Sequence, residues 1–539
     1  MKEDNSKKTF LGMNPIKVVF AMEYILQGLG NPFQGITYQP FFRHFTVDYG
    51  LNEAATQELF SKSYLAWSFK PILGFLIDAY GKTKIILTML LGSAVCFYFL
   101  APVVDVSVSV FFWYMFVLSI FLAATDVAVD RATVVEGEDE AKESGKSKAT
   151  TVGLNQAICW AAIYGTSIFS AIAGGWIADN APFNYLMIGL GVVPLLVLFV
   201  VRKLPDDTAP TIPLKESVMN FWTGLNTGPL MWIILFYFLF HFQPLMGAIW
   251  NNYLIETLKF SQTQIGFADA SAYVGYFFGV LLFAKWGVVW QERIGLRRIF
   301  QMFILLSIFL TLTQTILVDP IFSRITDKIG TVIPLPRMQV RLGFMAFYNV
   351  ILYFFLGFTR MSTFSLVGAV IPAKAAGSLF AGFMSVANLA YSFSYSTGSW
   401  FYTHGLEYSL VRFLQVGVFG IPAKVGDNMA IGMLILIGAT AYLLSFLAVH
   451  VLPDQRETMI SGDWADTMPS PERYKELGAG FLSAINKGTF ALFGVLLGTL
   501  TYFAGMGIIK SVLVAFFLVA FARKMFLDWR YDAHTGAGD

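Results

Sequence analysis

The sequence predicts an all-α protein that is embedded in a membrane. Of its 539 residues, 56% are hydrophobic and only 13% are charged, whereas an ordinary soluble domain has about 25% charged residues. Apolar stretches of roughly 20 residues, the length that a helix needs to cross a bilayer, recur between short polar loops. These observations predict two bundles of six helices and a C-terminal apolar hairpin, about 12 to 14 spans in all.

About twelve apolar runs of spanning length follow one another along the chain. We expect helices at 17–41, 58–79, 84–104, 107–130, 151–177, 184–201, 229–251, 264–286, 299–318, 341–366, 378–402 and 428–451. The polar break after the sixth run carries Pro205, Pro210 and Pro213 and divides the runs six and six. The predicted domains are a first bundle at 1–201, a central cytoplasmic loop at 202–228, a second bundle at 229–452 and an extension at 453–539.

The C-terminal extension contains a further apolar region, 490–521, that is interrupted by Lys510. Its length suffices for two short spans with Lys510 at the turn, or for one long tilted helix and a surface helix. We favour the hairpin, because it leaves Arg523, Lys524 and Arg530 on the side of the membrane that carries most other basic residues.

The distribution of Lys and Arg predicts the orientation of the chain. When the chain is traced through twelve spans, most basic residues fall on the side of the N-terminus, which the positive-inside rule assigns to the cytoplasm. The first 17 residues have neither the apolar core of a secretory signal nor the character of a transit peptide. We therefore expect a monomeric multi-pass protein of the cell membrane, plasma or inner.

The motifs of common enzymes and metal sites are incomplete in this sequence. Gly145-Lys146-Ser147 and Gly81-Lys82-Thr83 resemble the end of a phosphate-binding loop, but Glu140 and Leu76 stand where the first glycine is required. The five histidines form no His-Glu-x-x-His, and the two cysteines form no metal-binding pair. With a net charge of +2, nucleic acid is not an expected partner. We expect no enzyme, no cofactor and no metal.

The segment Gly74 to Lys84 has the features of a gating loop. Gly74 permits close helix packing, Gly81 permits a tight turn, and Asp78 can accept hydrogen bonds from helix-end amides while Lys82 holds the cytoplasmic side. A charged loop that merely obeys the positive-inside rule is the alternative. The segment resembles the loop between the second and third spans of the major facilitator superfamily, whose substrate site lies between two six-helix halves.

Three blocks resemble a narrower group, the folate-biopterin transporter family. They are Trp67 to Asp78, Ala124 to Asp130, and Ile371 to Leu389. The chain departs from the family pattern where Ala-Tyr-Gly follows Asp78 directly and where Arg131 follows Asp130. The resemblance implies a secondary transporter that moves a folate- or pterin-like organic anion by alternating access. Alternatives are a carrier of another amphipathic solute, such as a nucleoside-like metabolite or a muropeptide, or a receptor or assembly protein with the same fold.

Charged residues within the apolar runs are the candidates for gating and coupling. An ionised side chain at mid-bilayer costs about 2.5 to 3.5 kcal/mol, so such residues usually face a bundle interior or a cavity. Asp126 and Lys70 are expected to form an ion pair between helices, which either stabilises the fold or breaks during transport. Asp130 shares a helix face with Asp126, and we expect it to pair with Arg131, Lys82 or Lys84.

The predicted substrate site is centred on Arg360, which has no acid within one helical turn. Its planar guanidinium can bind a carboxylate at two points, as the glutamate tail of a folate would require. Helix-end carbonyls are the alternative partners. Asp126, Gln27 and Asn388 are the further polar members of the predicted site, and Trp67 could stack on a flat ring, as could Trp160, Tyr164 and Trp250.

Glu23 is a second buried acid that could exchange a proton. It lies on the first span, four residues before Gln27. Proton exchange through Glu23 or Asp126 would make the protein a symporter, with protons as a partner besides the small-molecule substrate and the lipid bilayer. The alternative is that Glu23 only lies near the inner membrane interface.

Overall fold

The structure is a computed structural model that describes residues 14–204, 213–218, 221, 230–245, 247–371, 376–404, 413, 416–417, 431–452 and 512. Within these residues nearly every segment is helical and none forms a strand. The predicted all-α membrane fold is thereby confirmed. The predicted hairpin at 490–521 and most of the central loop at 202–228 lie outside the described residues, apart from a few positions.

Both halves of the chain are built from long helices joined by short turns. The first half contains α1 (Pro15–Gly30), α2 (Tyr38–Arg43), α3 (Glu53–Ser68), α4 (Lys70–Tyr80), α5 (Thr83–Val104), α6 (Val108–Ser144), α7 (Lys148–Asn180), α8 (Phe183–Leu190) and α9 (Val192–Val201). The second half contains α11 (Leu230–His241), α12 (Ala248–Asn252), α13 (Gln262–Leu282), α14 (Val288–Ile294), α15 (Leu296–Thr313), α16 (Ile321–Val332), α17 (Arg337–Val370), α18 (Ala376–His404) and α20 (Ile431–Ala448).

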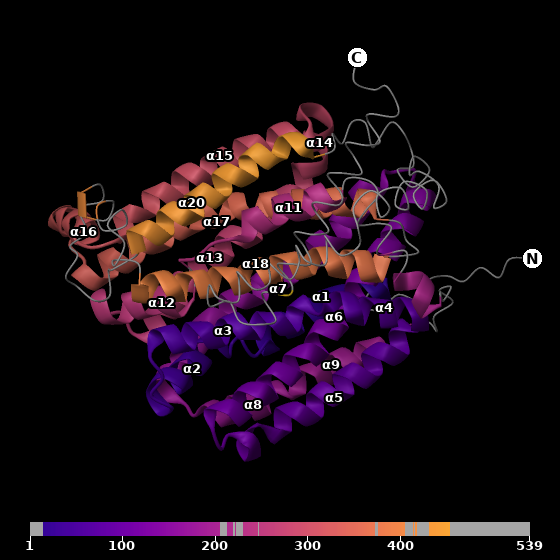
Figure 1. Cartoon of the computed structure of the whole chain (residues 1–539), viewed down its shortest axis with the longest axis horizontal. Helices are drawn as coiled ribbons and strands as arrows, with labels where there is room; N and C mark the ends of the chain where they lie inside the picture. The colour runs from indigo at the N-terminus through magenta and orange to yellow at the C-terminus, as the bar shows by residue number, and fades with distance from the viewer. Residues whose placement is uncertain are drawn as a thin grey trace, which may run out of the picture.

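The two halves pack against each other mainly through α18 of the second half and α7 of the first half. Figure 1 shows the first half below and the second half above, and α3 packs on α18 while α7 packs on α13 and α17. We call the end of the bundle where α1 begins the N-terminal face, and the end that holds α2, α12 and α16 the opposite face. The boundary between the halves therefore runs through the molecule from one face to the other.

Eight helices among the described residues are long and apolar enough to cross a membrane. They correspond to eight of the twelve predicted spans. Of the other four runs, 17–41, 58–79 and 229–251 are divided into shorter helices, and 378–402 forms the serine-rich α18. These four segments supply polar side chains to the boundary between the halves, and this lowers their apolar content.

The fourth predicted span ends too early, because helix α6 extends well beyond it. The apolar pattern predicts an end at 130, but the helix continues to Ser144 and is terminated by Gly145, whose φ is 69°. The acidic side chains of this extension are neutralised by neighbours: Lys142 and Lys148 both lie 2.9 Å from Glu138. A polar segment can remain helical where such ion pairs are available.

The first predicted span ends earlier than expected. Helix α1 stops at Gly30, and the turn that follows is held by Thr37, whose hydroxyl donates to the carbonyl of Asn31 at 2.7 Å. A cap also sets the start of α3, where the Asn52 side chain accepts from the amide of Ala55 at 2.8 Å. The Thr37 hydrogen bond holds a turn inside the run 17–41, which the apolar pattern predicts as a single span.

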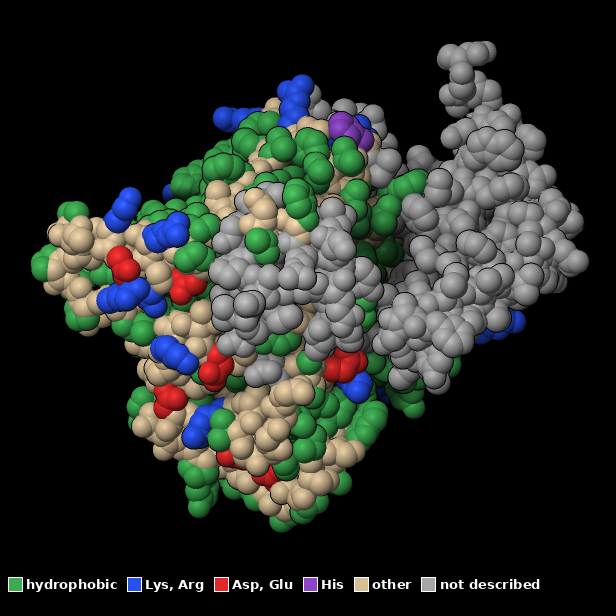
Figure 2. Space-filling model, turned by 60° about the vertical axis from the view of Figure 1, so that its left-hand side comes forward, with side chains coloured by type: hydrophobic (Ala, Val, Ile, Leu, Met, Phe, Trp, Pro, Cys, Tyr) green, Lys and Arg blue, Asp and Glu red, His purple; other side chains and the backbone are tan. Residues whose placement is uncertain are grey.

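The outer surface of the bundle carries large apolar side chains. Val103, Phe199 and Phe309 are each at least 59% exposed on α5, α9 and α15. Figure 2 shows hydrophobic side chains over the flanks and charged side chains toward the left-hand end. Such exposure suits contact with lipid rather than water, and the chain is a multi-pass membrane protein.

Candidate substrate site

A cavity of about 340 Å³ lies between the two halves. Its volume falls within the range of about 300 to 1,000 Å³ that is typical of small-molecule sites. All five residues that the sequence predicted for substrate binding line it: Arg360, Asp126, Gln27, Trp67 and Asn388. Since these side chains come from both halves, a bound molecule would contact both bundles at once.

Arg360, on α17, extends into this cavity and is held by two tyrosines. One guanidinium nitrogen donates to the hydroxyl of Tyr164, and the other terminal nitrogen donates to Tyr391 at 2.6 Å. The residue is 8% exposed, and its Nε is buried without a hydrogen-bond partner. Among the described residues no Asp or Glu forms an ion pair with Arg360. Its partners are hydroxyls and not the helix-end carbonyls that we considered as the alternative.

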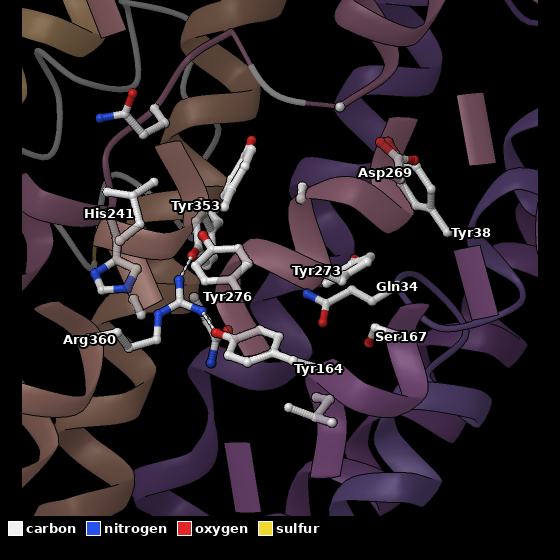
Figure 3. A pocket seen from close by; sticks show the side chains of 18 of the residues that line it. Gln34, Tyr38, Tyr164, Ser167, His241, Asp269, Tyr273, Tyr276, Tyr353 and Arg360 are labelled. Carbon is white, nitrogen blue, oxygen red and sulfur yellow. Dashed lines mark hydrogen bonds between the residues drawn. The ribbon is translucent and has the colours of Figure 1, made fainter. Parts of the chain in front are cut away.

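Aromatic rings surround the guanidinium group. The rings of Trp160 and Tyr276 each lie 5.1 Å from the Arg360 Cζ atom, within the range of a cation–π interaction. Tyr164 and Tyr276 stack on each other at a centroid distance of 4.6 Å and an interplanar angle of 6°. Figure 3 shows Tyr164 and Tyr276 beside Arg360. The cavity thus offers flat faces next to a positive charge, an arrangement that suits a planar anion.

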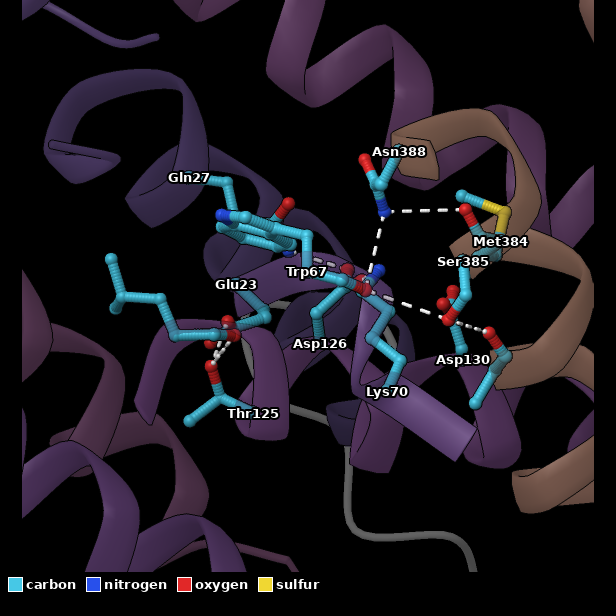
Figure 4. Close-up of polar contacts among 12 residues, drawn as sticks. Glu23, Gln27, Trp67, Lys70, Thr125, Asp126, Asp130, Met384, Ser385 and Asn388 are labelled. Atoms are coloured by element: carbon cyan, nitrogen blue, oxygen red, sulfur yellow. Dashed lines mark hydrogen bonds and ion pairs between the residues drawn. The ribbon is translucent and has the colours of Figure 1, made fainter. Parts of the chain in front are cut away.

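The predicted ion pair between Lys70 and Asp126 is confirmed. The Lys70 ammonium donates to one carboxylate oxygen of Asp126, and Gln27 donates to the other at 2.5 Å. Both charged residues are 2% exposed, and the ammonium lies 5.1 Å from the ring of Trp67. Figure 4 shows how α1, α4 and α6 bring these side chains together. The hydrogen-bond and ion-pair partners of Asp126 among the described residues therefore all belong to the first half.

Two more acids, Glu23 and Asp130, are buried close to this pair. Thr125 donates to Glu23 at 2.5 Å, while Tyr24 donates to Asp130 at 2.9 Å. The second carboxyl oxygen of each acid is buried and has no hydrogen-bond partner among the described residues. Neither acid lines the cavity.

The partners predicted for Asp130 are wrong. Instead of Arg131, Lys82 or Lys84, Asp130 contacts the neutral side chains of Tyr24 and Gln156. Arg131 is the next residue on α6, so its side chain points to another face of the helix, where it reaches Asp78.

Asp78 joins the two halves at the N-terminal face. Its carboxylate accepts from the Arg131 Nε at 3.2 Å, and from the backbone amides of Gly377 and Ser378 at 3.2 and 2.9 Å. Those amides belong to the first turn of α18, whose unpaired N–H groups attract an anion. Lys82 is exposed at the turn between α4 and α5, where it does not take part in this contact.

Contacts also join the halves at the opposite face. Gln39 on α2 donates to Asp269 on α13 at 2.9 Å. The hydroxyl of Thr263 donates to Asp179 at 2.6 Å, and Ser396 donates to Glu58 at 3.0 Å. The cavity is therefore bounded by contacts between the halves on both sides.

Comparison with known sequences assigns the family. Residues 27–466 match the BT1 family. The chain belongs to the BT1 family. As a member of this family, the protein is a membrane transporter and not an enzyme.

A crystal structure of a bacterial homologue of the iron transporter ferroportin, in its outward-facing state, is similar to this BT1 protein. The two are 16% identical, the TM-score is 0.44, and the similarity covers 80% of this chain and 98% of the other. No curated protein matches the chain in sequence.

The remaining predicted residue, Asn388, lies on α18 of this BT1 protein. Its amide donates to the carbonyl of Met384 at 3.2 Å and approaches the carbonyl of Trp67 at 3.5 Å (Figure 4). Asn388 thus links α18 to α3 and still lines the cavity.

Several residues that line the cavity were not predicted from the sequence. Asp269 is a lone acid within the apolar run 264–286, so the rule that selected Asp126 could have found it. Tyr276 and Tyr391 had no such signal, because the chain contains 23 tyrosines and their spacing does not show which ones face Arg360.

Proposed function

We propose that this BT1 protein is a secondary active transporter that moves a folate- or pterin-like organic anion by alternating access. The observation that carries the proposal is the buried guanidinium of Arg360, which has no carboxylate partner among the described residues. Burying a cation without a counter-charge is costly. The carboxylate of a ligand would supply that charge and could accept two parallel hydrogen bonds from the guanidinium.

The aromatic lining supports a planar substrate. Trp160 and Tyr276 flank the guanidinium, and a heteroaromatic ring inserted between such faces gains both apolar burial and stacking. Gln27 and Asn388 line the same cavity and provide neutral hydrogen-bonding groups for the edge of a ring. A pterin carrying a carboxylate combines the two features that this cavity would select.

Alternating access would open one face while the other stays closed. At the N-terminal face, which we assign to the cytoplasm from the distribution of Lys and Arg, the Asp78 contact to α18 would be the gate. At the opposite face the contacts of Asp269 and Asp179 would separate instead. Each set is small and polar, as a gate that must break in every cycle requires.

Proton coupling would follow from the composition of the buried acidic cluster. Glu23, Asp126 and Asp130 are three carboxyl groups served by one ammonium, that of Lys70. Keeping all three ionised within the membrane would leave excess negative charge at a high cost. We infer that at least one carboxyl group carries a proton and that its exchange accompanies transport, which would make the protein a symporter.

The test is uptake of radiolabelled folate and pterin into proteoliposomes that contain the purified full-length protein. The wild-type protein should accumulate the labelled compound, and a proton gradient should increase the accumulation. Arg360→Gln should abolish uptake of carboxylated compounds. Binding without accumulation would indicate a receptor, and accumulation only of nucleoside-like compounds or muropeptides would contradict the proposed substrate.

A further inference from the structure

Asp269 is a second charged group of the cavity, on the other side from Arg360. It lies on α13, whereas Arg360 lies on α17, and Figure 3 shows the two side chains separated by Tyr273 and Tyr276. Both charged residues line the cavity. A molecule that fills the space between them would therefore meet a cation at one end and a carboxylate at the other.

The carboxylate of Asp269 has one hydrogen-bond partner in the described part of the chain, the Gln39 amide nitrogen at 2.9 Å. No Lys, Arg or His of that part forms an ion pair with it. The amide oxygen of Gln39 is itself buried and without a hydrogen-bond partner, and the residue is 2% exposed. The Asp269 carboxylate and the Gln39 amide oxygen are thus neighbouring acceptors. The carboxylate has one donor among the described residues and the amide oxygen has none.

A small polar chamber adjoins these acceptors. Its volume is about 10 Å³, and its lining includes Asp269, Gln39, Ser167, Ser170 and Tyr273. Such a space is close to what one water molecule occupies. Because Asp269, Ser167 and Tyr273 also line the main cavity, an amino group of a ligand could enter the chamber while the ligand stays in the cavity.

We propose that Asp269, positioned by Gln39, is a specificity-determining residue that binds the donor edge of the transported molecule. This inference rests on the proposed function. The matching chemistry is a planar N–C–N unit with two parallel N–H donors, as in the 2-amino-4-oxopyrimidine ring of a pterin. The two carboxylate oxygens can accept both bonds, as they do from a guanidinium. A ring with a carbonyl in place of the amino group would direct an oxygen at the carboxylate and be repelled.

The experiment compares 6-carboxypterin with 6-carboxylumazine, which share the carboxylate and differ in the group at ring position 2. Affinities are measured by thermal stabilisation of the purified full-length protein. The wild-type protein should bind 6-carboxypterin about 10- to 100-fold more tightly than 6-carboxylumazine, because only the pterin can donate both hydrogen bonds to the charged carboxylate. Asp269→Asn should reduce this ratio to nearly 1, since an amide can pair with either ring.

Two further variants separate the possible failures. Arg360→Gln should weaken both compounds alike and leave the ratio unchanged. Asp179→Asn, which removes a carboxylate at the same face but outside the cavity lining, should also leave the ratio unchanged. If the wild-type protein binds neither compound, the proposed function fails. If it binds both equally, or if Asp269→Asn keeps the wild-type ratio, the proposed function stands and the role of Asp269 is refuted.

Discussion

At the scale of single residues, the buried charges of this protein differ in whether the chain supplies their partners. Lys70 and Asp126 satisfy each other within the first half. Arg360 and Asp269 face the cavity without an opposite charge among the described residues. Breaking a pair that is complete within the chain destabilises the folded protein, because it leaves one buried charge uncompensated. A charge without a counter-charge in the chain is instead available to a ligand. The two kinds of residue should therefore respond differently to mutation.

Lys70→Met tests the pair of Lys70 and Asp126. It leaves Asp126 as a buried carboxylate without its cation, which should destabilise the protein by about 3 to 5 kcal/mol. Adding Asp126→Leu should recover much of this loss, because no charge then remains uncompensated. Thermal unfolding of the single and double variants measures the effect, and Lys62→Met, which removes an exposed lysine from the preceding helix, is the matched control. A double variant less stable than Lys70→Met would contradict this account.

Asp105 gives a prediction about pH outside the membrane-spanning helices. Burial alone would raise the pKa of Asp105, but hydrogen bonds from Tyr49 and His44 outweigh it and hold the pKa below the ordinary value of 3.8. Because the folded-state pKa is lowered, this carboxylate stabilises the protein above about pH 4. That contribution should disappear as the pH falls through the lowered pKa.

Asp105→Asn should therefore cost about 1 to 3 kcal/mol at neutral pH and flatten the acid branch of the stability curve. The measurement is the melting temperature between pH 3 and pH 7. An acid branch as steep in the variant as in the wild-type protein would assign the acid sensitivity to other carboxyl groups.

At the scale of helices, the sequence located the eight long apolar helices of the described residues better than it located helix ends. Apolar runs located α5 and α13 closely, because lipid contact imposes the apolar pattern along most of each helix. The pattern could not locate the end of α6, where ion pairs sustain a polar helix, or the end of α1, where the turn depends on the Thr37 hydrogen bond. Both deviations arise from side-chain contacts that hydropathy does not encode.

In the candidate site, too, some residues could be predicted from the sequence and others could not. Lys70, Asp126 and Arg360 could be selected from the sequence because a charge within an apolar run needs a reason to be there. The tyrosines that hold Arg360 come from α7 and α18, and their convergence is a property of the packed bundle. The sequence therefore identified Arg360 and two of its aromatic neighbours, Trp160 and Tyr164. It did not identify Tyr276, Tyr391 or Asp269.

The close approach of α4 and α18 gives a prediction at this scale. A Cβ atom on Gly74 would lie 2.7 Å from the Ser378 Cα atom and 2.8 Å from the Gly377 carbonyl oxygen, both of them backbone atoms that cannot rotate away. Gly74→Ala should therefore push α18 away from Asp78, lower the melting temperature and reduce uptake. Gly92→Ala on α5 is the matched control, because its Cβ would meet no atom within 4 Å. Equal effects of the two substitutions would mean that the close packing at Gly74 is not required.

At the scale of the whole molecule, the two halves are linked on both sides of one cavity. Asp78 links them at the N-terminal face, and Asp179 and Asp269 do so at the opposite face. Transport by alternating access requires that these sets break in turn, so the long contact between α3 and α18 must open over part of its length. Ser61 and Ser392 lie in that contact, and each hydroxyl donates to the backbone carbonyl of the other residue at 2.8 Å.

Replacing this serine pair by cysteines should lock the halves together. The two hydroxyl oxygens lie 3.3 Å apart, so Ser61→Cys combined with Ser392→Cys should form a disulfide on mild oxidation. Uptake by the oxidised protein should then fall at least tenfold and recover on reduction, because α3 and α18 could no longer separate. Each single variant is a control, and Cys96, which is exposed, would first be replaced by alanine. Full uptake by completely cross-linked protein would show that the transport cycle does not open this contact.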